Sequence, residues 1–240
     1  MPERKKTIIF VHGSMGCNQV WKYQTQGLSA KNQVISIDLP GHFGTDCLEP
    51  PTMETYVTFL HEKIENLKLD KVILGGHSMG GAVVLSYYFQ YPEKVQALIL
   101  IGTGARLRVL PAILEMTKKN DPKLIQMMET VAFHKNTIRN QKELIKEVNR
   151  DMAKTSAEIG YCDFSICNEF DVMDKLVEIE VPTLIICGED DKLTPVKYSK
   201  YLNDHIPSST LQIIENAGHL VMLEQRDEVN KAIKEFLSKL

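Results

Sequence analysis

A serine flanked by glycines is the residue of this chain best suited to do chemistry. Ser78 lies in Gly76-His-Ser-Met-Gly80, which follows an apolar run at 71–74 and precedes a helical pattern at 82–91. A Gly-x-Ser-x-Gly sequence between a strand and a helix is typical of a tight turn that exposes the serine hydroxyl. We therefore predict that Ser78 is a nucleophile.

A serine hydroxyl is a poor nucleophile at neutral pH and needs a neighbouring base. Among seven histidines, His219 stands in Asn216-Ala-Gly-His219, directly after the last apolar run, and is the predicted base. Because it must start neutral, activity should fall on the acid side near pH ~6–7, around the ordinary histidine pKa. The other histidines are expected to shape glycine-rich turns (His12, His42, His77) or to be solvated (His61, His134, His205).

The histidine also needs an acid to orient it and to stabilise its charged form. The loop after the run at 183–187 carries three candidates, Glu189, Asp190 and Asp191. Two of these are expected to do turn-forming or helix-capping work instead.

Negative charge that develops on a substrate carbonyl needs backbone N–H donors. One expected donor is Met79, at the start of the helix after the nucleophile. The other is Ser14, in the loop His12-Gly-Ser-Met-Gly16, whose glycines permit a close approach to substrate. Cys17 is close to this loop, but nothing indicates a cysteine nucleophile.

Six short runs rich in Val, Ile and Leu must position these groups. They lie at 7–11, 33–37, 71–74, 97–101, 183–187 and 211–214. Continuous apolar runs are typical of parallel strands that are buried on both faces. Between them, segments such as 54–68 and 226–240 carry apolar stripes with helical spacing. The alternation predicts a doubly wound α/β fold.

The stretch 105–175 breaks this alternation, because it contains helical patterns and no convincing strand. We interpret it as a helical cap inserted into a core domain formed by 1–104 and 176–240. The cap is expected to determine which substrate is accepted.

Composition excludes several classes of function. The chain has 28 basic and 31 acidic residues, a net charge of −3, so nucleic acid and anionic membranes are unexpected partners. The longest apolar stretch, 97–101, is too short to span a bilayer. Five widely spaced cysteines predict no disulfide framework or zinc cluster, and favour a cytoplasmic location. No metal-ligand or phosphate-loop spacing is present, so no metal or cofactor is expected. The expected state is a monomer or homodimer.

The sequence resembles the α/β-hydrolase fold family over nearly its whole length. Five signatures stand in the family's order: His12-Gly13, Asp38-Leu-Pro-Gly41-His42, Gly76-His-Ser-Met-Gly-Gly81, Gly188-Glu-Asp-Asp191 with Pro195, and Gly218-His219. The resemblance implies a mostly parallel sheet with a helical cap, a serine nucleophile at Ser78 and a base at His219. It also places the acid at Asp191, with Asp190 as the alternative.

Two departures from the family pattern stand out. Little sequence precedes residue 7, so we expect about six strands, without the N-terminal edge strands of an eight-stranded sheet. The turn Gly41-His-Phe-Gly44 carries Phe43 where the family usually has glycine, which brings an aromatic ring toward the cap.

A serine nucleophile limits the classes of reaction that this protein could catalyse. Serine argues against the dehalogenases and epoxide hydrolases of this fold, which use aspartate, and Ala82 replaces the arginine typical of its menaquinone-pathway lyases. We expect a small-molecule ester substrate of short to medium acyl chain, such as a monoacylglycerol. The alternatives are a C–C bond hydrolase, a thioesterase or an acyltransferase with the same triad, or a non-catalytic small-molecule receptor.

The expected substrate pocket combines loop and cap residues: Gly13, Trp21, Phe43, Leu107, Met127, Met128 and Leu220. Trp21 is equally compatible with a place in the core, and the cap residues with packing against the domain. Arg106 and Arg108, at the cap entrance, either bind a carboxylate or phosphate of the substrate or are solvated.

Overall fold

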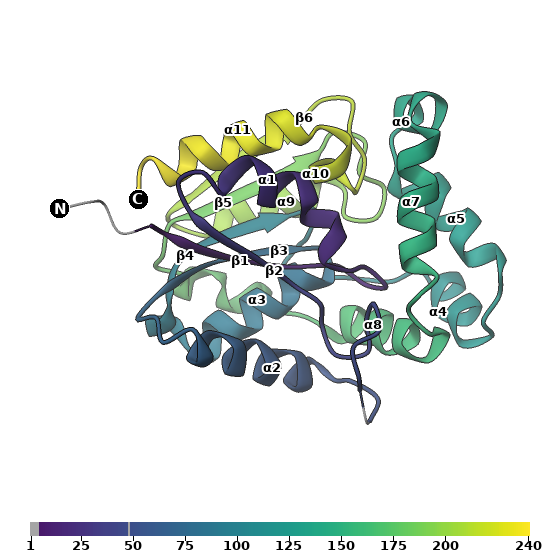
Figure 1. The fold of residues 1–240 in the computed structure, drawn as a ribbon, viewed down its shortest axis with the longest axis horizontal. Helices are drawn as coiled ribbons and strands as arrows, with labels where there is room; N and C mark the ends of the chain where they lie inside the picture. Colours follow the sequence, from purple (N-terminus) through teal and green to yellow (C-terminus); the bar gives the residue numbers. More distant parts are fainter. Residues whose placement is uncertain (1–4, 48) are drawn as a thin grey trace.

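The sheet of this protein has six parallel strands. A computed structural model describes residues 5–47 and 49–240 (Figure 1). Its strands are β1 (Thr7–Val11), β2 (Gln33–Ile37), β3 (Val72–His77), β4 (Val95–Ile101), β5 (Thr183–Gly188) and β6 (Ser209–Ile214), in the order β2-β1-β3-β4-β5-β6. The winding direction reverses between β1 and β3, so the predicted doubly wound α/β fold is confirmed. Loops at the carboxyl ends of β1 and β3 then meet at the position where such folds bind ligands.

Strand β3 extends beyond the apolar run at 71–74 from which it was predicted. Gly76 and His77 pair with Leu100 and Ile101 of β4, so the strand continues to the residue before Ser78. Strands β4 and β6 likewise begin at Val95 and Ser209, ahead of the predicted 97 and 211.

Helices cover both faces of the sheet, which explains the uninterrupted apolar runs. One face packs against α2 (Met53–Asn66), α3 (Met79–Gln90) and α9 (Val196–His205), and the other against α1 (Lys22–Leu28) and α11 (Arg226–Leu237). Within β1, Ile9 and Val11 belong to the first core, whereas Ile8 and Phe10 belong to the second. Alternate residues point to opposite faces, so every position of a fully covered strand must be apolar.

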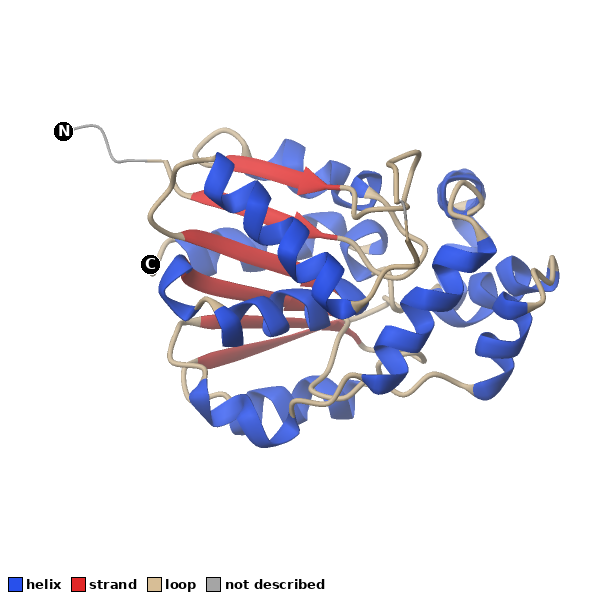
Figure 2. Ribbon diagram, turned by 90° about the horizontal axis from the view of Figure 1, so that it is seen from below, coloured by secondary structure: helices blue, strands red, loops and turns tan. Residues whose placement is uncertain are grey.

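Five helices stand between β4 and β5 in the sequence, and we call them the insertion helices. They are α4 (Pro111–Lys118), α5 (Lys123–Ala132), α6 (Lys135–Asn140), α7 (Lys142–Met152) and α8 (Ala157–Glu169). Figure 2 shows them beyond the end of the sheet toward which the strands run. Helices α4, α5, α7 and α8 share a small core of their own, which Met15 of the β1–α1 loop joins.

Short helical turns complete the chain: the 3-10 helices η1 (Asn18–Trp21), η2 (Pro92–Lys94) and η3 (Met173–Glu178), and α10 (Val221–Glu224). Across the described ranges, no helix combines the length and apolarity that crossing a bilayer requires.

Candidate active site

Ser78 occupies a strained turn between β3 and α3. Its backbone has φ 53° and ψ −119°, in a region that non-glycine residues rarely adopt. Hydrogen bonds hold the turn: the Ser78 N–H donates to Ile101 O at 3.0 Å, and Ser78 O accepts the Thr103 hydroxyl at 2.8 Å and the Gly81 N–H at 2.9 Å. A Cβ on Gly76 would lie 2.2 Å from Gly80 O, so only glycine allows the chain to fold back this tightly. Strain of this kind is commonly retained where function requires it.

His219 is paired with a buried carboxylate. Its Nδ1 lies 2.9 Å from Asp191 Oδ2, and both side chains are almost fully shielded from solvent. Nδ1–H donates to the carboxylate, which leaves the Nε2 lone pair as the basic atom of the neutral ring. The β5–α9 loop and the β6–α10 loop supply the two residues, and both loops open at the carboxyl edge of the sheet.

Asp191 accepts further hydrogen bonds that fix its orientation. Oδ1 accepts the N–H groups of Leu193 and Thr194, each at 2.9 Å, and Oδ2 accepts the Thr194 hydroxyl at 2.7 Å. Burial alone would raise the pKa of Asp191, but the charge and hydrogen bond of His219, with the bonds from Thr194, lower it below its ordinary value. The carboxylate therefore stays ionised at neutral pH.

The residue before the serine supports the histidine loop. His77 Nε2–H donates to the carbonyl oxygen of His219 at 3.0 Å. Burial, reinforced by the proximity of His219, lowers the pKa of His77 to about 3. His77 is thus a neutral hydrogen-bond donor beneath His219 rather than a second base.

The carboxylate of Asp190 pairs with a different histidine, His134. His134 accepts the Asn136 N–H at Nδ1 (3.1 Å), so its Nε2 carries the proton and donates to Asp190 Oδ2 at 3.0 Å. The expectation that His134 is solvated is wrong, because the residue is only 5% exposed. Its ring closes the contact between α6 and the β5–α9 loop.

The β1–α1 loop lies directly against the serine. A Cβ on Gly13 would come within 3.0 Å of Ser78 Cβ. Two N–H groups of this loop are already engaged, because Gly16 donates to Gly13 O (3.0 Å) and Met15 donates to Asp163 Oδ2 (2.8 Å).

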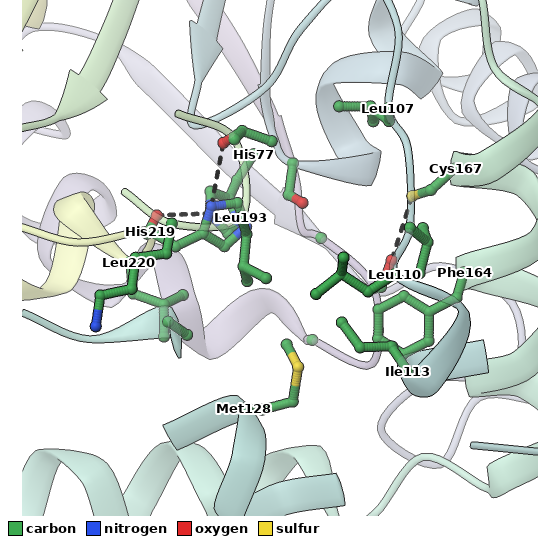
Figure 3. Close-up of a pocket in the computed structure, with 18 of the residues that line it drawn as sticks. His77, Leu107, Leu110, Ile113, Met128, Phe164, Cys167, Leu193, His219 and Leu220 are labelled. Atoms are coloured by element: carbon green, nitrogen blue, oxygen red, sulfur yellow. Dashed lines mark hydrogen bonds between the residues drawn. The ribbon is translucent and has the colours of Figure 1, made fainter. Parts of the chain in front are cut away.

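A cavity of about 330 Å³ lies between the sheet edge and the insertion helices. Ser78 and His219 both line it, together with Gly13 and Ser14. Figure 3 shows apolar side chains on the side facing His219. This apolar wall consists of Leu107, Leu110, Ile113, Met128 and Phe164, and Cys167 lies beside it.

Four of the seven expected pocket residues line this cavity: Gly13, Leu107, Met128 and Leu220. The other three lie outside its lining. Trp21 is buried in the core, stacked on Phe10 with the ring centroids 4.4 Å apart. Met127 packs among the insertion helices, and the Phe43 ring lies 3.9 Å from Lys154 Nζ of the insertion.

Two buried carboxylates that the sequence analysis did not single out connect the insertion to the site. Asp163 of α8 bonds to the β1–α1 loop, as described above. Glu224 accepts the N–H groups of Gly218 (Oε1) and His134 (Oε2), each at 2.7 Å. In the sequence, the one indication that Asp163 is buried is its place as a single acid directly before the apolar residues Phe164, Ile166 and Cys167.

No cluster of His, Cys, Asp and Glu able to hold a metal ion occurs in the part of the chain that the structure describes. His12 and His42 are engaged in loop structure: His12 Nδ1–H donates to Gly13 O (2.8 Å) and Nε2 accepts the Leu39 N–H (3.1 Å).

A strained serine elbow at the edge of a parallel sheet, with a paired histidine opposite, defines the α/β-hydrolase class. The family model for the alpha/beta hydrolase fold matches residues 6–225, and the chain belongs to this family and is a hydrolase.

Similar proteins have several different reactions attached to their names. A Bacillus subtilis (strain 168) protein, provisionally named 2-succinyl-6-hydroxy-2,4-cyclohexadiene-1-carboxylate synthase, is 30% identical over 100% of this chain and 93% of its own. The monoacylglycerol lipase ABHD6 of Bos taurus is 27% identical over 99% of this chain and 77% of its own. A solved thermophilic esterase is 37% identical, with a TM-score of 0.85, covering 98% of this chain and 91% of its own.

Proposed function

We propose that this protein hydrolyses carboxylic esters through an acyl-enzyme, with Ser78 as nucleophile, His219 as general base and Asp191 as the orienting acid. One observation carries the proposal. The strained serine and a histidine held at Nδ1 by a buried carboxylate line the same apolar cavity. That arrangement supports a basic Nε2 facing the nucleophile.

The reaction proceeds in two stages. Ser78 Oγ attacks the ester carbonyl carbon while His219 Nε2 takes the hydroxyl proton. The tetrahedral intermediate collapses, and the histidine gives that proton to the leaving alcohol. Water, deprotonated by the same histidine, then attacks the acyl-serine, and the released serine oxygen regains its proton.

The N–H groups of Ser14 and Met79 form the oxyanion hole. Met79 is the first residue of α3, where backbone donors have no intrahelical acceptor. In the β1–α1 loop, the N–H groups of Met15 and Gly16 are already used. Ser14 therefore supplies the second donor, and the contact of Gly13 with Ser78 supports a position close to the reacting carbonyl.

The insertion helices serve as the cap over a core of 1–104 and 176–240. A cavity of about 330 Å³ suits short to medium acyl chains, since small-molecule sites usually span about 300–1,000 Å³. Its apolar wall suits the hydrocarbon part of an acyl group. All five cysteines are free thiols, which supports a cytoplasmic location.

The decisive experiment is intact mass after incubation with a small fluorophosphonate, for wild type and Ser78→Ala, followed by a 4-nitrophenyl ester series of increasing acyl length. A single adduct on wild type alone, with turnover of short to medium esters, is the expected result. Ser78→Ala should lose on the order of 10⁴–10⁶ in kcat if the three residues act as a unit. An unreactive wild type that binds esters without turnover would instead favour a receptor.

A further inference from the structure

The charged side chains that line the cavity are all positive. Three basic residues contribute to it, Arg108, Lys192 and Lys197, and no aspartate or glutamate does. The whole chain, in contrast, has more acidic than basic residues. All three basic residues are exposed to solvent.

Internal ion pairs leave most of this charge uncompensated. Arg106, just before the cavity residues, is paired with Asp171, whose Oδ2 lies 2.6 Å from its Nε. The same carboxylate oxygen is 3.8 Å from Arg108 Nη2, so one acid is shared by two guanidinium groups. Arg106 is not part of the cavity lining.

The two lysines have no acidic partner among the described residues. Lys192 Nζ donates to the backbone carbonyl of Thr130 at 3.3 Å. Within residues 5–47 and 49–240, no carboxylate lies within ion-pair distance of Lys192 or Lys197.

The three cations come from segments that meet beside the site. Arg108 lies between β4 and α4, and Lys192 and Lys197 lie in the β5–α9 loop and the first turn of α9. A Cβ on Gly104 would lie 2.8 Å from Tyr198 Cδ2, which places the first segment against the start of α9. The side of the cavity formed by these two segments is therefore positively charged. Lys192 directly follows Asp191 in the sequence.

We infer that the preferred substrate is an ester that carries a carboxylate, whose apolar part contacts Phe164 and Met128 while its anionic end faces Arg108, Lys192 and Lys197. This inference rests on the proposed function, since it names the substrate class of the same site. Cations at the mouth of an apolar cavity attract an anion and orient it, which raises the capture rate of a charged ester over a neutral one.

Matched ester pairs test the inference. On the acyl side, 4-nitrophenyl hydrogen adipate is compared with 4-nitrophenyl hexanoate, which has a methyl group in place of the carboxylate. On the alcohol side, 4-(butyryloxy)benzoate is compared with 4-(butyryloxy)benzamide. The measured quantity is the ratio of kcat/KM for the charged ester to kcat/KM for the neutral one.

The variant is Arg108→Gln/Lys192→Gln/Lys197→Gln, and the control is Lys200→Gln, an exposed lysine of α9 outside the cavity lining. The ratio should fall about tenfold in the triple variant for at least one pair, since each exposed ion pair contributes a factor of up to about five. Salt at about 1 M should reduce the wild-type ratio, because the Debye length is then only about 3 Å. The control should leave the ratio unchanged.

Ratios within twofold of wild type for both pairs in the triple variant would overturn the inference while esters are still hydrolysed. Absence of turnover for all four esters in the wild type would instead be a failure of the proposed function itself. The two results are distinguished by the neutral esters alone.

Discussion

Asp163 Oδ2 accepts the backbone N–H of Met15 at 2.8 Å, although 148 residues separate the two in sequence. The same carboxylate accepts His42 Nε2–H at 2.8 Å and the Tyr56 hydroxyl at 2.7 Å, and Asp163 is fully buried. Met15 has φ 54°, so its backbone is held in a conformation that a free loop would seldom adopt. An insertion helix therefore fixes the loop that touches Ser78.

Removing this carboxylate should destabilise the protein strongly. Asp163→Ala leaves the buried His42 ring and the Met15 N–H without their acceptor, and breaking a buried ion pair from one side costs about 3–5 kcal/mol. Asp163→Asn, which keeps one acceptor oxygen, should cost less. Denaturant unfolding followed by the fluorescence of Trp21, the only tryptophan, measures both.

Asp151→Asn is the matched control for that series. Asp151 lies in a neighbouring insertion helix, and its partners Lys154 and Arg150 are solvent-exposed side chains. Its loss should cost no more than about 1 kcal/mol. Equal losses of unfolding free energy in Asp151→Asn and Asp163→Asn would show that the buried contacts of Asp163 stabilise the protein no more than an exposed ion pair does.

The contact between His42 and Asp163 should make the free energy of unfolding fall as the pH rises. Burial alone would lower the pKa of His42, but the charge and hydrogen bond of Asp163, with the carbonyl of Pro40, raise it above 6.5. The stabilisation that protonated His42 contributes is therefore complete below about pH 6.5, the pKa of histidine in the unfolded chain. It is lost as the pH rises through the higher pKa that His42 has in the folded protein.

His42→Gln tests this sign. The difference in unfolding free energy between wild type and the variant should shrink as pH increases above 6.5. A difference that stays constant above pH 6.5 would mean that His42 is already neutral in the folded protein.

Neighbouring aspartates should differ sharply in their effect on catalysis. Asp191→Asn removes the acceptor that holds His219 in its Nδ1–H form, and kcat should fall roughly 10³–10⁴-fold. Asp190→Asn affects only the contact with His134, and its kcat should stay within about threefold of wild type if catalysis depends on Asp191 alone. Steady-state hydrolysis of one 4-nitrophenyl ester by both variants is sufficient, and the opposite ranking would reassign the acid to Asp190.

Local pattern was sufficient to predict the sheet and the loops at its edge. The central strands β1, β3, β4 and β5 are covered on both faces, so their apolar runs are nearly continuous, and the glycines around Ser78 mark a turn that larger residues cannot form. The position of His219 follows from the same geometry, because loops after parallel strands open on one edge.

Contacts made by the insertion could not be predicted this way. Met127 and Met128 are adjacent in α5, and successive residues of a helix point about 100° apart, so only one of them faces the cavity. Which one does depends on how the helix is rotated against α8 and the core. Asp163 and Glu224 likewise gain their roles from Met15 and His134, partners that are distant in sequence.

Thiol reagents should leave the activity intact, although Cys167 lines the cavity 3.5 Å from Ser14 Oγ. Burial raises the pKa of Cys167 to about 12, so at pH 7.5 almost none of this thiol is in the reactive thiolate form. Cys17 and Cys187 are also buried, whereas Cys47 and Cys162 are partly exposed.

Iodoacetamide at pH 7.5 should therefore add at most two carbamidomethyl groups, with ester hydrolysis unchanged. The double variant Cys47→Ser/Cys162→Ser should take up none, and Cys167→Ser should remain active, because the sulfur has no part in the proposed chemistry. Loss of activity in step with modification of Cys167 would mean that this thiol is accessible and ionised, and that the nucleophile assignment to Ser78 has to be re-examined.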